Sequence, residues 1–392
     1  MKPKLARKKA FVSLLLVFAL VLLAACGGGS GSGGSQQAGT GSPSAGTSSG
    51  SGGSSAPAET KKETVRLRVG AGHPPEAAKW VELFRDWYIP EVNKRLESTR
   101  YQIDWFEAYG GTVVVMGEEL SAIGDNTVDM GFVTVAFYPS RITIANIGYN
   151  TPFSSPDPRV IAKAAQKLFD KYPQYAQEFE ENNQKVLSII SSEGYELFTK
   201  FPVNSLADLQ NRKIAAVGAN LHWINNVGTV PVQSNVGEAY QSLQSGVYEG
   251  WVMLPDTARG YRLHEVAPHL TKVGFGSVIL SSLTINLDAW NKLPDEVKNV
   301  LAEVGAEFGG VVANAKYENT QNVIAGMEKE GLKVSQLPEA DVAKWIEAVQ
   351  QVPNNFVKTL NDKGHPGKEI VEDYIKFQEE EGYTFTKRYV IQ

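Results

Sequence analysis

The chain has 392 residues, of which 42% are hydrophobic and 21% charged, ordinary values for a globular protein with room for two domains. Its single cysteine excludes an internal disulfide and a cysteine-based zinc cluster, so the fold depends on packing. The formal net charge is −5, and removing the first 25 residues, with five basic and no acidic residues, leaves roughly −10. Such an acidic body lacks the basic surface that nucleic-acid binding needs.

The N-terminus, residues 1–25, has the pattern of a secretory signal peptide: a basic start, the apolar run Phe11 to Leu23, and then small residues. The run is shorter than the roughly 20 residues of a membrane-spanning helix. It ends in Leu23-Ala24-Ala25-Cys26, which resembles the bacterial lipobox, in which the cysteine is lipidated and becomes the new N-terminus. The sequence therefore predicts a lipid anchor at Cys26, and the alternative is ordinary cleavage followed by a cysteine without a role.

Residues 26–63 contain the lipobox cysteine and a stretch rich in glycine and serine. A chain of this composition buries too little apolar surface to fold and behaves as a flexible tether that spans roughly 30 Å. We expect the tether to hold the folded part near a membrane.

The first part of the body reads as alternating strands and helices. A strand is expected at 65–69, a strand-like segment at 101–106 and a buried strand at 129–134, with a short helix over 117–123. Between the first two strands, Trp80, Phe84, Tyr88, Val92 and Leu96 recur every fourth residue and form one helical stripe, with a kink expected at Pro90. This order predicts a right-handed βαβ sheet.

A second run of the same kind begins near residue 186. Strands are expected at 213–218, 230–232 and 248–254, and a helix between Asn235, as N-cap, and Gly246, with Glu238 placed as in a capping box. The longest pattern, 294–330, predicts a helix of about 55 Å that would bridge two lobes. A late strand at 333–337 and a helical C-terminal region follow.

Motifs for catalysis are absent from the sequence. It contains no G-x-S-x-G, P-loop, H-E-x-x-H or C-x-x-C pattern. His264 and His269 are five residues apart and would face different sides of a helix, so we expect no metal site there. No arrangement for nucleophilic or acid–base catalysis stands out, which is weak evidence against an enzyme because catalytic residues can lie far apart in a sequence.

Two motifs in the segment 204–255 resemble one family of transport proteins. They are Asn204-Ser205-Leu206-Ala207-Asp208-Leu209 followed by Lys213-Ile214, and Glu238-Ala239-Tyr240 followed by Leu243-Gln244 and Gly250. Here the chain resembles the solute-binding proteins of tripartite ATP-independent periplasmic (TRAP) transporters, the dicarboxylate-binding-protein (DctP) family. The resemblance covers residues 64 to about 370, including the strand at 129–134 and the helix around Tyr261 to Val266.

The resemblance implies an α/β, two-lobed fold similar to periplasmic binding proteins, with crossover hinge strands and a long helix over both lobes. Lobe I is expected at 64–192 plus 279–318, and lobe II at 193–278 plus 319–392. The implied function is an extracytoplasmic, lipid-anchored receptor that is not an enzyme. It captures a small organic solute in the cleft and delivers it to membrane permease subunits. A sensory receptor and a tethered enzyme on the same scaffold are the alternatives.

The match departs from the family where ligand is held. The family often places an arginine, which binds a carboxylate bidentately, at the position of Ala215, and a polar residue near Met253. Two hypotheses follow. In one, the ligand is a less polar acid or a neutral molecule and the wall consists of Trp251, Met253, Trp223 and Tyr138. The alternative for these side chains is packing in the core or over a helix.

In the other hypothesis, the ligand is a carboxylate held elsewhere. The holding group would be Arg141, backbone amides near Asn220, or a ligand-bridging calcium ion, although Arg141 also fits a surface position. Thr134 and Phe137 at the end of the third strand, His73 after the first strand, and Tyr195, where some relatives carry a second arginine, complete the candidate ligand-binding residues. No other cofactor is expected.

Overall fold

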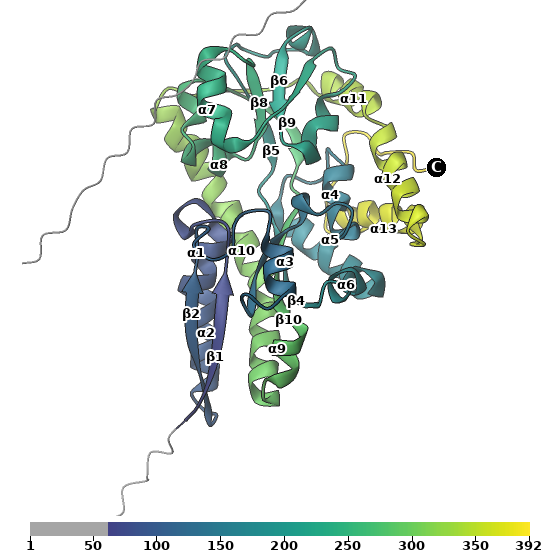
Figure 1. Cartoon of the computed structure of the whole chain (residues 1–392). Coiled ribbons are helices and arrows are strands. Elements are labelled where there is room, and N and C mark those ends of the chain that lie inside the picture. Colours follow the sequence, from purple (N-terminus) through teal and green to yellow (C-terminus); the bar gives the residue numbers. More distant parts are fainter. Residues whose placement is uncertain (1–61) are drawn as a thin grey trace, which may run out of the picture. The chain divides into compact units, whose positions relative to one another are not determined.

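Two β-sheets organise the chain, and each takes its strands from separate stretches of the sequence. The computed structural model describes residues 62–392, so the expected signal peptide, Cys26 and nearly all of the tether lie outside the described residues. The described residues form one compact unit with two lobes (Figure 1). Lobe I is sheet A with the helices packed on it, and lobe II is sheet B with the helices packed on it.

Sheet A confirms the predicted βαβ arrangement. Its strands stand in the order β2-β1-β3-β10-β4, and β1 is parallel to both β2 and β3. The late strand β10 runs antiparallel between β3 and β4. The bounds are β1 Glu63–Gly70, β2 Tyr101–Ala108, β3 Met130–Thr134, β4 Gln184–Ser191 and β10 Ile279–Asn286.

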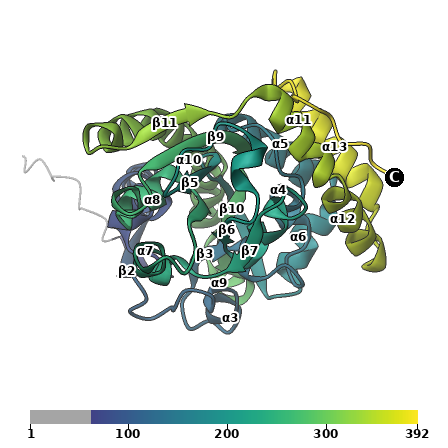
Figure 2. The same ribbon diagram turned by 90° about the horizontal axis from the view of Figure 1, so that it is seen from above.

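Sheet B has the order β11-β9-β5-β8-β6-β7. Strand β6 is parallel to β7 and β8, whereas β5 is antiparallel to β8 and β9. The bounds are β5 Tyr195–Thr199, β6 Lys213–Ala216, β7 Val230–Gln233, β8 Gly250–Met253, β9 His269–Gly276 and β11 Lys333–Gln336. Seen from above, β5 and β6 lie near the middle of the view, with α7 and α8 on one side and α11, α12 and α13 on the other (Figure 2).

The helical stripe after β1 is interrupted where proline was expected to disturb it. Helix α1 (Lys79–Leu83) passes into a π-helical turn, Phe84–Tyr88, before α2 (Ile89–Leu96) resumes. Pro90 lies in the first turn of α2, where its missing N–H would have bonded to the preceding turn. All five stripe residues are buried, so the interruption keeps one apolar face against the sheet.

Helix α7 (Val236–Ser245) begins and ends at the residues that the sequence predicts. The side chain of Asn235 accepts a hydrogen bond of 3.2 Å from the backbone N–H of Glu238. Gly246 ends the helix in the left-handed conformation at φ 78°. The helix follows β7, so its N-terminus stands at the carboxyl edge of sheet B.

Helix α10 (Asp295–Lys329) is a single helix of 35 residues that contacts both lobes (Figure 1). Val297 to Val312 belong to the core formed with β1, α1 and α2, while Ile324 and Met327 belong to the core beneath α7 and α8 (Pro255–Gly260). The bridging helix predicted from the sequence is therefore confirmed.

Among the remaining helices, α3, α4, α5, α6 and α9 contact strands of sheet A, whereas α12 and α13 pack on other helices. Their bounds are α3 Glu119–Gly124, α4 Ile147–Asn150, α5 Pro158–Lys171, α6 Pro173–Glu180, α9 Leu287–Lys292, α11 Glu339–Ala348, α12 Gln351–Asp362 and α13 Gly367–Glu380. Helix α12 contacts α4, and α13 contacts α5. The lobe boundaries drawn from the sequence stay a prediction. Within 62–392, no helix combines the length and hydropathy needed to cross a membrane.

Candidate functional site

The two sheets are joined by paired crossover segments. One connects β4 to β5 through Ser192 and Glu193, and the other connects β9 to β10 through Ser277 and Val278. The backbone N–H of Ser192 donates to the carbonyl of Val278 (2.9 Å), and the Ser277 hydroxyl donates to the carbonyl of Ser192 (2.5 Å). The two segments thus pass between the lobes as one bonded pair, which is a hinge geometry.

A cavity of about 580 Å³ lies between the lobes beside this hinge. It is formed where β3, β6 and β7 end, the carboxyl edges at which α/β proteins commonly bind ligands. From lobe I it is lined by Ala136, Phe137, Pro139, Asn146, Tyr149 and Asn150. From lobe II it is lined by Val217, Gly218, Ala219, His222, Gln233, Ser234 and Asn235.

The cavity lining is mostly apolar, with several polar side chains and no charged ones. None of its lining residues is Asp, Glu, Lys or Arg. Burial lowers the pKa of His222, so this side chain is neutral at pH 7. Its Nε2 lies 2.9 Å from the carbonyl of Tyr149, which can only accept, so the proton sits on Nε2 and Nδ1 is left as an acceptor.

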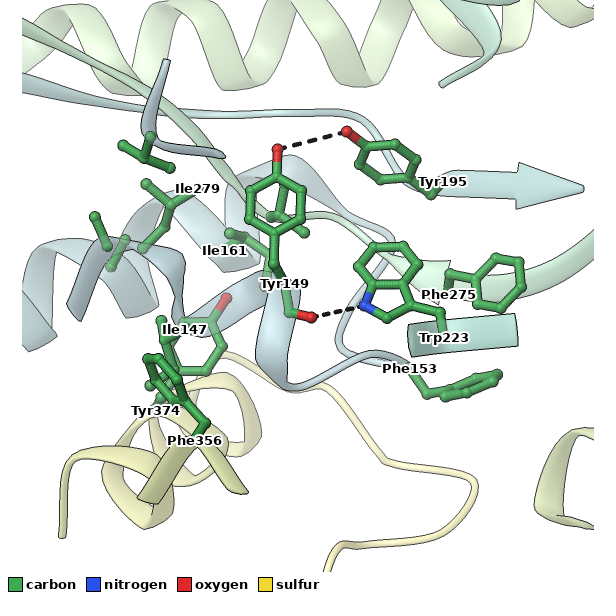
Figure 3. Packing of buried hydrophobic residues seen from close by; sticks show 14 of the residues in the cluster. Ile147, Tyr149, Phe153, Ile161, Tyr195, Trp223, Phe275, Ile279, Phe356 and Tyr374 are labelled. Atoms are coloured by element: carbon green, nitrogen blue, oxygen red, sulfur yellow. Dashed lines mark hydrogen bonds between the residues drawn. The ribbon is translucent and has the colours of Figure 1, made fainter. Parts of the chain in front are cut away.

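Behind the cavity, three aromatic side chains connect the lobes (Figure 3). Tyr149 from α4 points its hydroxyl at that of Tyr195, at 3.5 Å, and its carbonyl accepts a hydrogen bond from Trp223 Nε1 at 2.6 Å. The rings of Tyr195 and Trp223 meet edge to face at 5.2 Å. Burial, with Tyr149 beside it, raises the pKa of Tyr195 well above its ordinary value, so its hydroxyl stays protonated.

Of the residues predicted from the sequence, one lines the cavity and several lie close behind it. Phe137 lines it and is 45% exposed. Asn220 and Trp223 are buried on the 3-10 helix η6 (Gly218–Ile224) that forms part of the cavity wall. Thr134 ends β3, buried, and its hydroxyl has no hydrogen-bond partner among the described residues.

Three other candidates lie on the opposite face of sheet B. Ala215 and Trp251 are register partners on β6 and β8, and both belong with Met253 to the core beneath α7 and α8. The small methyl side chain of Ala215 leaves space for the large indole of its neighbour Trp251, so this face of the sheet is filled by packed side chains. The structure does not bring these three residues to the cavity.

The remaining candidates are separate. The Tyr138 hydroxyl donates to Glu119 Oε2 (2.9 Å) inside lobe I, and Arg141 is exposed on the following turn. His73 packs edge to face against Trp80, at 5.2 Å, and its burial lowers its pKa to about 4. These three residues lie elsewhere in lobe I and do not line the cavity.

Sequence reasoning missed a buried ionic cluster at the hinge. Lys316 Nζ from α10 lies 2.5 Å from Glu193 Oε2, with side chains 2% and 1% exposed. Asn319 donates to Asp256 Oδ1 (3.1 Å), and burial, together with Glu193, raises the pKa of Asp256 to about 6. The Lys316 ammonium also lies 5.3 Å from the centre of the Trp80 ring. The sequence did contain one signal for this cluster, namely Lys316, a lysine among the apolar residues of the predicted long helix.

Cavity residues were missed as well. Asn146, Tyr149 and Asn150 come from the region around a four-residue helix that no motif marks. Gln233 and Asn235 directly follow a strand, which was the only signal for them. Across residues 62–392, no three His, Cys, Asp or Glu side chains meet in an arrangement that could hold a metal ion.

Comparison with known proteins identifies the family to which this architecture belongs. The chain matches the model of the DctP family, described as bacterial extracellular solute-binding protein, family 7, over residues 92–359. A solute-binding protein of Albidiferax ferrireducens is 23% identical over 270 residues, which span 67% of this chain and 78% of that protein.

Solved structures share the fold at low identity. A TRAP periplasmic solute-binding protein from Desulfovibrio salexigens superposes with a TM-score of 0.72 at 21% identity, over 81% of this chain and 97% of that one. A TRAP solute-binding protein from Rhodoferax ferrireducens in complex with copurified benzoate gives 0.70 at 14% identity, over 81% and 98%. These structures confirm the predicted two-lobed α/β fold. Because the family model covers most of the described residues, the chain belongs to the DctP family of bacterial extracellular solute-binding proteins.

Proposed function

We propose that the chain is the receptor of a TRAP-type secondary transporter, which captures a small organic acid or a related less polar solute and delivers it to membrane permease subunits. The observation that carries this proposal is the cavity of about 580 Å³ between the lobes, within the usual size of small-molecule sites. The benzoate found in the relative from Rhodoferax ferrireducens supports a solute of this size. Membership of a binding-protein family also confirms the prediction that the chain is not an enzyme.

The mechanism is closure of the lobes around the solute. Phe137 and Tyr149 approach it from lobe I, and His222 and Gln233 from lobe II, so a bound solute contacts both. Such a ligand favours the closed form by its differential affinity for the two forms, and no covalent step is needed. The paired crossover segments and α10 supply the connections about which the lobes move.

We further propose that Cys26 carries a lipid and that residues 27–60 tether the receptor to a membrane. The lipobox-like sequence and the glycine- and serine-rich composition support this. Metabolic labelling with a fatty acid, compared between the natural chain and a Cys26→Ser variant, tests it. Label that remains in the variant would contradict the anchor.

A thermal-shift screen of the purified chain tests the solute-binding proposal. Binding to the folded state alone raises the melting temperature by mass action. We expect a concentration-dependent rise with some members of a panel of organic acids, aromatic acids and their neutral analogues. Recovery of the compound unchanged after incubation supports a receptor, whereas turnover by the purified chain would contradict the proposal and favour a tethered enzyme.

A further inference from the structure

Carboxamide side chains dominate the polar lining of the cavity. Asn146 and Asn150 come from lobe I, and Gln233 and Asn235 come from lobe II. A fifth carboxamide, Asn220, is buried in the same wall. The hydrogen bonds of these side chains show which of their atoms remain available to a solute.

Lobe I presents acceptors to the cavity. Asn146 donates its Nδ2 to the carbonyls of Val135 (2.9 Å) and Ile142 (2.7 Å), and Asn150 donates its Nδ2 to the carbonyl of Asn146 (2.9 Å). Because backbone carbonyls only accept, these bonds fix the orientation of both amides. Their Oδ1 atoms remain as acceptors for a donor on the solute, and Asn150 also keeps one N–H, since only one of its two is used.

Lobe II presents a different set. The Oδ1 of Asn235 accepts from the N–H of Glu238 (3.2 Å), which leaves its Nδ2 as a donor. Gln233 is exposed and has both amide atoms available. A solute group that carries both donors and acceptors therefore matches the two walls, whereas a carboxylate has only acceptors and would face the oxygens of lobe I.

The charge of the cavity leads to the same conclusion. No cation lines it, and His222 is neutral. The guanidinium that the family motif predicts at residue 215 is replaced by an alanine on the far face of the sheet. An anion would lose its hydration here without gaining an ion pair, which is unfavourable. The one feature that favours an anion is the N-terminus of α7, which already has Glu238 in its first turn.

Asn220 supplies an independent observation. Its side chain is fully buried directly behind the residues that line the cavity and beside the Tyr195 hydroxyl, and neither its Nδ2 nor its Oδ1 makes a hydrogen bond of good geometry among the described residues. Its neighbours Gly218, Ala219 and His222 line the cavity from the same 3-10 helix. A buried amide with poorly satisfied hydrogen bonds destabilises the free protein, and it places further donor and acceptor capacity in the wall behind the cavity.

We propose that the cavity recognises an uncharged solute group bearing both hydrogen-bond donors and acceptors, such as an amide or a set of hydroxyls, and that Asn220 and Gln233 determine this specificity. The inference rests on the proposed function and narrows its solute class. Phe137 and Tyr149 would cover the apolar part of the solute.

Matched pairs of probes test the proposal: benzamide against benzoate, and D-glucuronamide against D-glucuronate, each titrated into the purified chain at pH 7 by thermal shift and calorimetry. Within a pair, shape is nearly constant and only the charge and the donors change. We expect the amide of at least one pair to bind, and its acid to bind at least about tenfold more weakly.

Two variants and a control complete the experiment. Asn220→Leu should weaken amide binding by about tenfold and raise the melting temperature of the free protein, because it removes a buried amide with poorly satisfied hydrogen bonds. Gln233→Leu, at an exposed position, should weaken binding without unfolding risk, and Asn355→Leu, exposed on α12, should leave it unchanged.

The outcomes separate the two proposals. Binding of the acids in preference to the amides would overturn this inference and leave the proposed receptor function standing. Amide binding unaffected by both Asn220→Leu and Gln233→Leu would also overturn it. If neither series binds, the inference and the proposed function both fail for solutes of this size.

Discussion

Replacing Lys316 by methionine removes one partner of the buried ion pair at the hinge. Its ammonium lies 2.5 Å from Glu193 Oε2, and both side chains are almost fully buried. Methionine keeps an unbranched apolar chain in the same space, so the variant creates little cavity. The main change is a buried carboxylate that has lost its cation.

The expected cost follows from leaving that carboxylate buried without its cation. Breaking a buried pair by removing one partner typically costs about 3–5 kcal/mol. We therefore expect Lys316→Met to lower the free energy of unfolding by about 3–5 kcal/mol at pH 7.

Urea unfolding at pH 7, followed by tryptophan fluorescence, measures this loss. The double variant Lys316→Met/Glu193→Gln is the matched control, because it removes both charges and should recover about 2 kcal/mol of the loss at pH 7. A single variant within about 1 kcal/mol of the natural protein at pH 7, or a double variant that recovers none of the loss, would refute the reasoning.

Three further predictions concern backbone, titration and surface. Gly276→Ala should lower the free energy of unfolding by about 1–3 kcal/mol more than Gly274→Ala in urea unfolding, since both glycines have positive φ but only at Gly276 would a Cβ meet a backbone oxygen, 2.5 Å away. The pKa of Asp256 is raised from 3.8 to about 6, so its protonated form stabilises the folded state below about pH 4, and this contribution is lost as pH rises through 6. Asp256→Asn should remove that part of the pH dependence of unfolding, and an unchanged profile would contradict the assignment. Arg141→Ala should leave both stability, within about 0.5 kcal/mol, and any solute-induced thermal shift unchanged, because this side chain is exposed outside the cavity; a lost shift would favour a carboxylate held at that residue.

The parts of the fold that were predictable have local causes. The caps of α7, the length of α10 and the stripe of α1 and α2 follow from residue spacing within one segment. Strands β9 and β10 were not predicted, because their pairing with β5 and β4 depends on segments about 70–100 residues away, as the registers Leu197↔Thr271 and Leu283↔Ser188 show. Long-range pairing leaves little signal in either segment alone.

The candidate site was less predictable for a related reason. Family motifs pointed to Ala215 and Met253, but the side-chain alternation of β6 and β8 places them on the packed face of sheet B. The cavity instead collects residues just beyond strand ends, such as Gln233, and residues of the short helix α4. Which side chains meet across the lobes depends on their relative placement, which no local pattern encodes. Whether a carboxylate or a less polar solute binds stays open to the experiments above.

The continuous helix α10 has a consequence for how the protein unfolds. Its first half completes the core of one lobe through Phe308 and Val312, and its last turns complete the core of the other through Ile324 and Met327. If either lobe unfolded, part of this helix would expose its apolar face to water and would lose its packing partners. The thermodynamic stabilities of the two lobes are therefore coupled, and residues 62–392 are expected to unfold in one cooperative transition.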